Sequence, residues 1–243
     1  MPGSRTVKQD YYSQSDVVAG YDDWRFRSAG GRYVDQCEQG RALFWLNFLQ
    51  PHEKILDMPV GTGRLAHSLL QQGFTAVAGA DFSPAMLEAS AKRCGPQLTL
   101  SRQDAFATHF PDDTFAAVVS LRFTFHHEEL LPLLQELTRI TQPGGLVVFD
   151  TLRWTPRSWL GWLQKPFGGR IWSHNEAQVH RVLAELGLTI DGMDRILLFP
   201  SFAYRFFPAP ILRFVQTLER YLPPILRSKA VWAVRKGATR DQQ

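Results

Sequence analysis

Short apolar segments alternate with helix-like segments through the middle of this 243-residue chain, and this rhythm limits the folds that it can adopt. The apolar runs begin at Ile55, Thr75, Gln97, Phe115 and Leu146. Strands that are apolar along their whole length are usually buried on both faces of a sheet. The pattern therefore predicts an α/β fold, in which helices cover both faces of a parallel sheet and the crossovers are right-handed.

Residue patterns assign each expected element to a stretch of the chain. Apolar runs predict strands at 55–58, 75–80, 97–101, 115–121, 146–150, within 188–199 and at 230–234. Helical spacing predicts helices at 33–49, 65–72, from Ser83-Pro84 onward, and at 128–141, 175–186 and 210–221. A serine followed by proline at the first helical position is a typical helix start. The stretch 24–32 is expected to be a loop, and 7–21 a short helix.

The length suits a single domain, 1–243, with additions to the sheet. Residues 1–50 are expected to form an N-terminal helical cap. Two insertions, 152–172 and 200–228, interrupt the alternation; the first holds four tryptophans and four basic residues, but no acid. The second contains an amphipathic helix, whose apolar face is expected to hold Ile211, Phe214, Val215, Leu218 and Leu222.

Composition argues against several classes of protein. The net charge of +4 is modest and there is no basic tail, so a nucleic-acid partner is not expected. Cys37 and Cys94 are too few for a disulfide framework or a cysteine-based metal site, and no metal is expected. The first ten residues lack an apolar signal region, and no apolar run reaches the roughly 18 residues that span a bilayer. We therefore expect a cytoplasmic protein.

A turn with two glycines follows the first expected strand, which Asp57 closes. A loop that leads into a helix N-terminus presents outward-facing N–H groups and binds small polar ligands. Residues 61–66 formally match the dinucleotide-binding pattern G-x-G-x-x-A, and Asp81 lies near its ribose-binding position. A negative charge at Asp57, however, would repel a pyrophosphate. The turn therefore suits a ligand that carries hydroxyls or a positive charge.

Four stretches in order resemble the motifs of the class I S-adenosylmethionine-dependent methyltransferases, in the broad group that includes the ubiquinone and menaquinone biosynthesis methyltransferases. These stretches are residues 55–63, 79–87, 103–115 and 139–145. The resemblance implies a Rossmann-like, seven-stranded, mostly parallel sheet with helices on both faces. It also implies an antiparallel last strand, which 230–234 would supply, and S-adenosylmethionine as the cofactor.

The resemblance implies roles for the glycine-containing loop. Asp57 would lie near the cationic methionine end of the cofactor, while Gly61 and Gly63 would let the backbone approach it without a Cβ clash. Pro59 stands where most relatives have glycine, and it is also expected beside the cofactor. Because proline has no N–H, it cannot donate a hydrogen bond there.

Further contacts are implied along the cofactor. Asp81 would accept hydrogen bonds from both ribose hydroxyls. Phe82 and Met86 would pack against the adenine. Asp104 would accept from the adenine amino group, with the Ala105 N–H as a donor beside it.

Residues after the fourth expected strand and near the N-terminus complete the implied site. Leu121 and Arg122 would lie beside the methionine moiety. Tyr12 and Tyr21 would close over the cofactor, as N-terminal aromatic residues do in relatives.

Methyl transfer is an in-line displacement at an already activated carbon, so the enzyme mainly aligns the donor with the acceptor and excludes water. A general base is needed only where the acceptor must lose a proton. His126 and His127 are the candidates, since they follow the fourth expected strand. An alternative role for either residue is to cap the helix that follows.

Aromatic residues are dense between Phe199 and Leu222, a stretch that lies almost wholly in the second insertion, at positions 199, 202, 204, 206, 207, 214 and 221. They would form a lid, together with 152–172, around a small apolar or aromatic acceptor. Alternatively, they pack on the sheet, form a homodimer contact, or make a peripheral membrane contact with the tryptophan-rich insertion. Two other functions stay open, namely a NAD-type oxidoreductase and a non-catalytic regulatory protein that binds S-adenosylmethionine.

Overall fold

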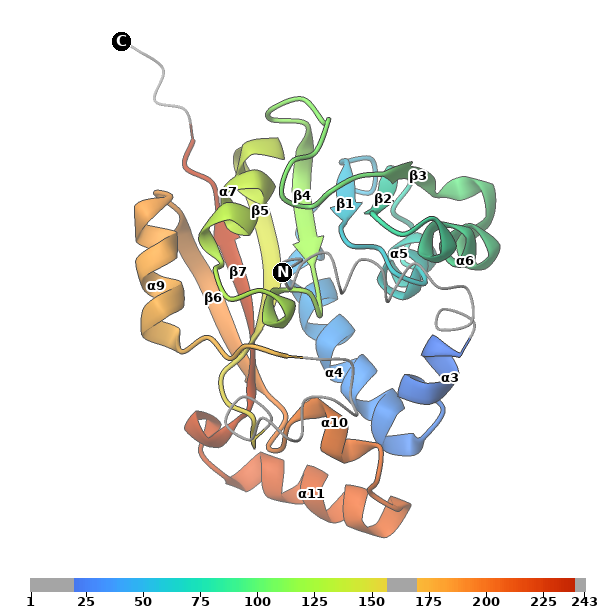
Figure 1. The fold of residues 1–243 in the computed structure, drawn as a ribbon, viewed down its shortest axis with the longest axis vertical. Helices are drawn as coiled ribbons and strands as arrows, with labels where there is room; N and C mark the ends of the chain where they lie inside the picture. Colours follow the sequence, from blue (N-terminus) through green and yellow to red (C-terminus); the bar gives the residue numbers. More distant parts are fainter. Residues whose placement is uncertain (1–19, 157–169, 239–243) are drawn as a thin grey trace.

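The computed structural model describes residues 20–156 and 170–238, and within them a seven-stranded sheet forms the centre of the molecule (Figure 1). The strand order is β3-β2-β1-β4-β5-β7-β6. The strands are β1 (Ile55–Asp57), β2 (Val77–Asp81), β3 (Thr99–Arg102), β4 (Phe115–Ser120), β5 (Thr141–Leu152), β6 (Thr189–Ile196) and β7 (Lys229–Arg235). The first five are parallel, and β7 lies between β5 and β6, antiparallel to both. The predicted α/β fold and its antiparallel last strand are confirmed.

Helices cover both faces of this sheet. They are α3 (Tyr21–Phe26), α4 (Ala29–Leu46), α5 (Arg64–Gln71), α6 (Pro84–Cys94), α7 (Leu131–Ile140), α9 (Glu176–Glu185), α10 (Ser201–Tyr204) and α11 (Ala209–Tyr221). One buried apolar cluster joins the sheet to α4, α5, α10 and α11. A second cluster joins its other face to α7 and α9. Among the residues that the structure describes, no helix combines the length and the hydropathy that a membrane span requires.

Strand β4 shows how the sequence produces this layered arrangement. Its six residues are all buried, and their side chains alternate between the two apolar clusters. Ala117 and Val119 pack with the first cluster, whereas Val118 packs with the second. A strand with both faces in the core must be apolar throughout, which explains the uninterrupted run in the sequence.

Local signals fix several helix starts. The Ser83 hydroxyl accepts a hydrogen bond from the Met86 N–H at 3.2 Å, and Pro84 occupies the first turn of α6. Asn175 and Gln178 form a reciprocal capping box at the start of α9. Both caps provide hydrogen-bond acceptors for N–H groups of the first helical turn, which have no partner inside the helix.

The prediction of a loop at 24–32 is wrong, because the end of α3 and the first turn of α4 lie there. Gly30 and Gly31 are buried inside α4 rather than in a turn. A Cβ at Gly30 would overlap the Tyr204 carbonyl, and one at Gly31 would overlap the Arg25 carbonyl. The two glycines therefore permit close packing of α4 against neighbouring backbone.

Several element boundaries also differ from expectation, among them those of α7 and β5. Helix α7 ends at Ile140 and is shorter than predicted. Strand β5 begins at Thr141 and continues to Leu152, because Thr141 already pairs with Phe115 and Leu152 pairs with Lys229. The expected helix at 7–21 lies almost wholly outside the described residues, and so does most of the insertion at 152–172.

The amphipathic helix α11 forms as predicted, but its buried face matches the prediction only in part, since Val215 is buried as expected. Leu212 and Val215 are buried, whereas Ile211 and Phe214 are exposed. Glu219 accepts hydrogen bonds from the hydroxyls of Tyr33 and Tyr204, on α4 and α10. These inward bonds fix the rotation of the helix about its axis, so apolar spacing alone does not identify its inner side.

Gly63 offers a test of this packing, because it has φ +77° and a Cβ there would overlap the Ser90 side chain of α6. We expect Gly63→Ala to lower the free energy of unfolding by about 3 kcal/mol, from backbone strain and displacement of α6. Gly187→Ala is the control, since Gly187 has φ +65° but open space around it; its loss should be only about 1 kcal/mol. Urea unfolding of both variants measures the difference, and equal losses would contradict the packing role.

Candidate functional site

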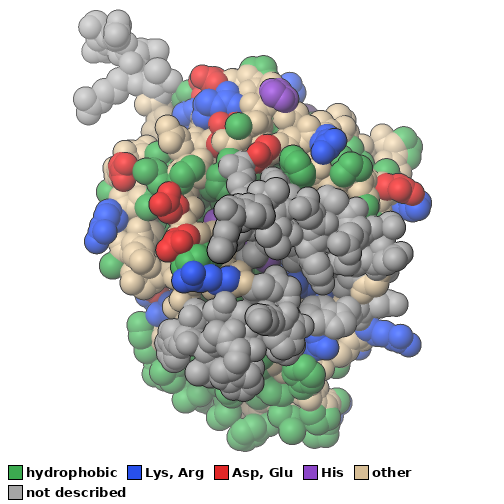
Figure 2. All heavy atoms as spheres, viewed as in Figure 1, with side chains coloured by type: hydrophobic (Ala, Val, Ile, Leu, Met, Phe, Trp, Pro, Cys, Tyr) green, Lys and Arg blue, Asp and Glu red, His purple; other side chains and the backbone are tan. Residues whose placement is uncertain are grey.

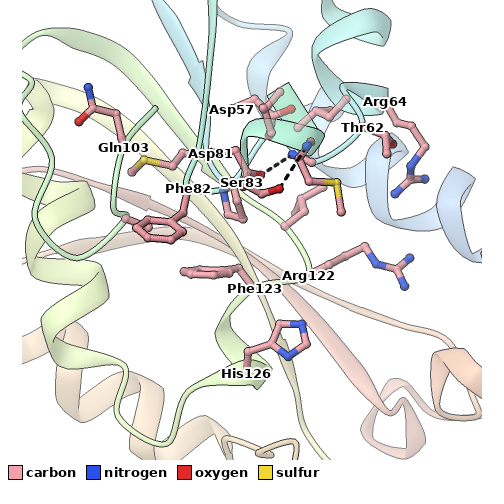
Figure 3. Close-up of a pocket in the computed structure, with 18 of the residues that line it drawn as sticks. Asp57, Thr62, Arg64, Asp81, Phe82, Ser83, Gln103, Arg122, Phe123 and His126 are labelled. Atoms are coloured by element: carbon pink, nitrogen blue, oxygen red, sulfur yellow. Dashed lines mark hydrogen bonds between the residues drawn. The ribbon is translucent and has the colours of Figure 1, made fainter. Parts of the chain in front are cut away.

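A large cavity opens at the carboxyl ends of β1, β2 and β4, where Figure 3 shows side chains from several elements converging. It contains about 1220 Å³ of space including its mouth. Ligands of open α/β sheets bind at this edge. Twelve residues expected at the site line the cavity: Asp57, Pro59, Gly61, Asp81, Phe82, Met86, Asp104, Ala105, Leu121, Arg122, His126 and His127.

The loop after β1 bends back onto the end of β2. The Gly61 N–H donates to Asp81 Oδ2 at 2.9 Å, and the Ser83 N–H donates to Asp81 Oδ1 at 2.9 Å (Figure 3). Gly61 has φ +53°, a left-handed conformation that favours glycine. Val60 also packs so close to Gly79 that a Cβ there would lie 2.8 Å from Val60 Cγ2. These hydrogen bonds and this packing contact hold the ends of β1 and β2 together beside the cavity.

Asp81 has an unusual protonation equilibrium. Burial raises the pKa of this carboxyl to about 6, although the N–H groups of Ser83, Gly61 and Phe82 oppose the shift. Each carboxylate oxygen can accept more than one hydrogen bond. Asp81 therefore keeps acceptor capacity toward the cavity while it holds the loop.

Asp57 lies deeper, beneath the first turn of α5. Its Oδ2 accepts a hydrogen bond from the Ala66 N–H at 3.2 Å, so the acid faces the positive end of the helix. Burial raises the pKa of Asp57 well above its usual value, although Ala66 and Arg64 oppose the shift. A cationic ligand group nearby would favour the ionised form of this acid.

Residues after β2 and β3 form a mixed apolar and polar wall. Phe82 and the buried Met86 face this part of the cavity. Asp104 Oδ1 accepts from the Phe106 N–H at 3.0 Å, which shapes the loop that carries Ala105. Apolar faces beside one oriented carboxylate suit a flat heterocycle with an amino group.

Three expected residues are not placed in the cavity wall. Gly63 does not line the cavity; it begins α5 and contacts α6. Tyr12 lies outside the described residues. Tyr21 begins α3, but its side chain is outside the described part of the chain.

The N-terminal segment nevertheless reaches the glycine loop. Thr62 Oγ1 donates to Asp22 Oδ1 of α3 at 2.9 Å, and Arg93 of α6 forms an ion pair with the same carboxylate. Asp22 therefore connects α3 to the loop and to α6 at the edge of the cavity.

Helix α4 supplies three wall residues that the sequence reasoning missed, Asp35, Glu38 and Gln39. The sequence contains a signal for one of these residues, Glu38. Glu38 lies in the buried i, i+4 series with Val34 and Ala42. A single acid in such an apolar stripe needs a buried partner.

That partner is Lys229 of β7, which also binds a second acid. Lys229 Nζ lies 2.5 Å from Glu38 Oε1 and 2.5 Å from Asp150 Oδ2, and all three side chains are almost fully buried. Arg122 Nη1 lies 3.0 Å from Glu38 Oε2. Two acids and two bases from α4, β5, β7 and the end of β4 thus form one charge cluster.

The protonation of the cluster follows from its geometry. Burial raises the pKa of Glu38, but Arg122 and Lys229 outweigh it and lower the value to about 2. Burial raises the pKa of Asp150, and Lys229 offsets only part of this shift. Glu38 therefore stays ionised at neutral pH and holds both cations.

Asp150 also sets the backbone of Arg122, whose N–H donates to Asp150 Oδ1 at 2.8 Å. Arg122 has φ +60°, which is uncommon for a residue with a Cβ. The buried cluster thus holds the strained turn after β4 in place. This turn carries Leu121 and Arg122 into the cavity wall.

The two histidines after β4 occupy different positions. The His127 ring packs against Phe106 and Phe123, with each pair of ring centroids 4.6 Å apart. His126 lines the large cavity and also a second, adjoining cavity. His126 is therefore the histidine placed between the two spaces.

The second cavity is smaller and has an aromatic and basic wall. It holds about 820 Å³ including its mouth, and shares Arg122 and His126 with the first. Its apolar wall residues are Phe26, Val34, Phe125, Leu152, Ile171, Pro200 and Phe202, and its basic ones are Arg25, Arg122, Arg205 and Lys229. The two cavities are thus adjacent at the end of β4, where Arg122 and His126 line both of them.

Sequence comparisons agree with this geometry. A family model described as a methyltransferase domain matches residues 55–145. A demethylmenaquinone methyltransferase of Thermus thermophilus is 31% identical over 163 residues, which are 65% of this chain and 69% of the relative. A demethylmenaquinone methyltransferase of Beutenbergia cavernae is 35% identical over 113 residues, 44% of this chain and 45% of the relative. The chain therefore spans less than half of this second relative's length.

Solved structures show the same fold. The magnesium protoporphyrin IX methyltransferase of Synechocystis, with S-adenosylhomocysteine bound, superposes with a TM-score of 0.70. It is 18% identical, and the match covers 97% of this chain and all of that one. A geranyl diphosphate methyltransferase in complex with geranyl diphosphate and sinefungin gives a TM-score of 0.64 at 18% identity, covering 82% of this chain and 77% of that one.

From the charge cluster we expect that replacing a buried lysine destabilises the protein far more than replacing an exposed one. Lys229→Met leaves Glu38 and Asp150 buried without their shared cation, so we expect a loss of about 3–5 kcal/mol in the free energy of unfolding. Lys92→Met is the matched control, because its ion pair with Glu88 is exposed; its urea midpoint should not change. If the two variants unfolded at the same urea concentration, the cluster would not support the fold.

Proposed function

The chain belongs to the class I S-adenosylmethionine-dependent methyltransferases, and we propose that it methylates a small apolar or aromatic acceptor held in the second cavity. The observation that carries the proposal is the meeting of two cavities at Arg122 and His126. The larger one matches the chemistry of the family's cofactor. The smaller one has the aromatic wall that an apolar acceptor needs.

The residues of the large cavity fit S-adenosylmethionine. Asp81 would accept the ribose hydroxyls, since both of its oxygens are already oriented by N–H donors. Phe82, Met86 and Asp104 would hold the adenine, with the Ala105 N–H as a donor. Gly61 would let the loop approach the cofactor without a Cβ.

The methionine end would lie between the β1 and β4 ends. Asp57 offers a negative charge there, and Pro59, Leu121 and Arg122 complete the wall. The missing N–H of Pro59 is compatible with this fit, because the Gly61 N–H supplies the donor that holds the loop. Glu38 neutralises the Arg122 guanidinium, which limits repulsion of a cationic ligand.

Catalysis would depend on positioning. The cofactor supplies an activated methyl group on its sulfonium. The chain's own residues align the acceptor with that group and keep water out of the shared region. His126 would accept the proton that an acceptor hydroxyl or acidic C–H must lose. His127 would instead maintain the wall through its contacts with Phe106 and Phe123.

The wall of the second cavity favours one class of acceptor. Phe26, Phe125 and Phe202 offer ring faces, whereas Arg25 and Arg205 place positive charge nearby. An aromatic ring that carries hydroxyl or carbonyl oxygens matches both features, because guanidinium groups stabilise a developing oxyanion. Quinol-type acceptors have this chemistry, and the relatives of Thermus and Beutenbergia are named for demethylmenaquinone.

Cofactor binding should depend on pH through Asp81. Burial raises the pKa of Asp81 to about 6, and ribose hydroxyls donate best to the ionised form. We therefore expect the contribution of Asp81 to the affinity for S-adenosylhomocysteine to be constant above pH 7 and to fall toward tenfold per pH unit below about 6. Calorimetry on the wild type and on Asp81→Asn measures this; the variant should bind weakly and without this pH dependence. Tighter binding of NADH than of S-adenosylhomocysteine would instead support a dinucleotide enzyme.

His126→Ala should separate chemistry from cofactor binding. If His126 is the base, kcat with a short-chain demethylmenaquinol should fall about 10²–10⁴-fold, while the Kd for S-adenosylhomocysteine stays unchanged. His109→Ala, at an exposed loop position, is the control and should keep full activity. An unchanged kcat in His126→Ala would remove the base role, and methyl transfer that is undetectable in the wild type would count against this acceptor.

A further inference from the structure

The outer face of α11 and the turn after it form a continuous apolar surface. Phe214 is 62% exposed and Tyr221 82% exposed. The exposed apolar side chains of this region, hereafter the α11 face, are Phe206, Ile211, Phe214, Tyr221, Ile225 and Leu226. Figure 2 shows hydrophobic side chains gathered over the lower surface of the molecule, where Figure 1 places α11.

The core does not need these side chains. Leu212 and Val215 provide the buried contacts of α11, and Glu219 fixes the helix through Tyr33 and Tyr204. Phe214 and Tyr221 therefore point away from the sheet although their burial would stabilise the protein. A large apolar patch of this kind marks an interaction surface.

The charged side chains that α11 exposes to solvent are all positive. Arg213 and Arg220 are exposed on α11. Glu219 is the one acid in residues 199–228. It is turned inward, since it also accepts the Leu198 N–H at 2.7 Å. Apolar and aromatic side chains flanked by arginines are typical of a helix that lies in the interface of a membrane.

We propose that the α11 face docks this protein on the surface of an anionic lipid bilayer. Phe214 and its apolar neighbours would enter the boundary between headgroups and acyl chains. Arg213 and Arg220 would remain at the level of the phosphates, which attract them electrostatically. The helix would lie in the plane of the surface, because it has only 13 residues and its inner side, with Leu212 and Val215, is packed against the protein.

A second copy of the chain fits this face less well. A symmetric dimer would bring the same patch of two copies together. The positive charges of Arg213 and Arg220 from both copies would then lie in one interface, while Glu219 is already engaged within each chain. Anionic lipid supplies the opposite charge that the patch itself lacks.

Docking would also place the proposed acceptor site near the bilayer. Helix α10 contributes Ser201 and Phe202 to the second cavity, and the exposed Phe206 of the α11 face follows two residues after α10 ends. A lipophilic acceptor would thus have a short path from the bilayer to that cavity. This point rests on the proposed function, whereas the docking itself depends only on the α11 face.

Vesicle flotation tests the proposal with the full chain. Wild-type protein should float with vesicles of phosphatidylcholine that contain 30% phosphatidylglycerol, and bind pure phosphatidylcholine more weakly. The double variant Phe214→Ser/Ile225→Ser should bind at least tenfold more weakly. Phe48→Ser is the matched control, since Phe48 is 73% exposed but follows the far end of α4; it should bind like wild type.

The arginines are tested separately. Arg213→Gln/Arg220→Gln should bind the anionic vesicles about fivefold more weakly for each arginine removed, and should lose most of the preference over pure phosphatidylcholine. Calorimetry with S-adenosylhomocysteine on every variant shows whether the cofactor site is intact. Vesicle binding without S-adenosylhomocysteine binding would support docking and refute the proposed function.

Three results would overturn the proposal. One is wild-type protein that stays in the soluble fraction with both kinds of vesicle while it binds S-adenosylhomocysteine. Another is equal vesicle binding by wild type and Phe214→Ser/Ile225→Ser. The third is a wild-type dimer in sedimentation velocity that Phe214→Ser/Ile225→Ser dissociates, without any vesicle binding, because the α11 face would then be a self-association surface.

Discussion

The buried ion pairs of Lys229 with Glu38 and Asp150 connect the parts of the protein that form the site. They join α4 to β5 and β7, and Asp150 holds the turn after β4 through the Arg122 N–H. Buried ion pairs are often no more stable than apolar contacts, but removal of one partner is costly. The cluster therefore specifies one arrangement of α4, the strands β5 and β7, and the turn between the cavities.

That arrangement separates two tasks in space. The β1 and β2 ends, with Gly61 bonded to Asp81, form a rigid recess of the kind that the family uses for its cofactor. The second cavity draws its wall from α3, α4, α10 and the segments that flank β5. Under the proposed function, variation in these additions would change the acceptor without a change in the recess. Arg122 and His126 line both spaces, and under the proposed function they mark where the methyl group would pass.

Motif-bearing parts of the site were predictable, since they lie at strand ends. Asp57, Asp81 and Asp104 each follow an apolar run, and parallel strands bring such positions to one edge of the sheet. The wall residues of α4 were missed because their distance from the motifs along the chain conceals their contact in space. Gly63 matched a motif but serves the packing of α5 against α6, a contact that no local pattern shows.

The sequence by itself determined the alternation of strands and helices, the order of the motifs and the family, because these depend on local periodicity and on residues close in the chain. Only the tertiary structure decided which residues of distant segments meet. It paired Glu38 with Lys229, 191 positions apart, and rotated α11 so that Glu219 faces inward and Phe214 outward. Burial determines these contacts, because a charged side chain inside the protein requires a partner of opposite charge or a hydrogen-bond partner, however distant that partner is in the sequence.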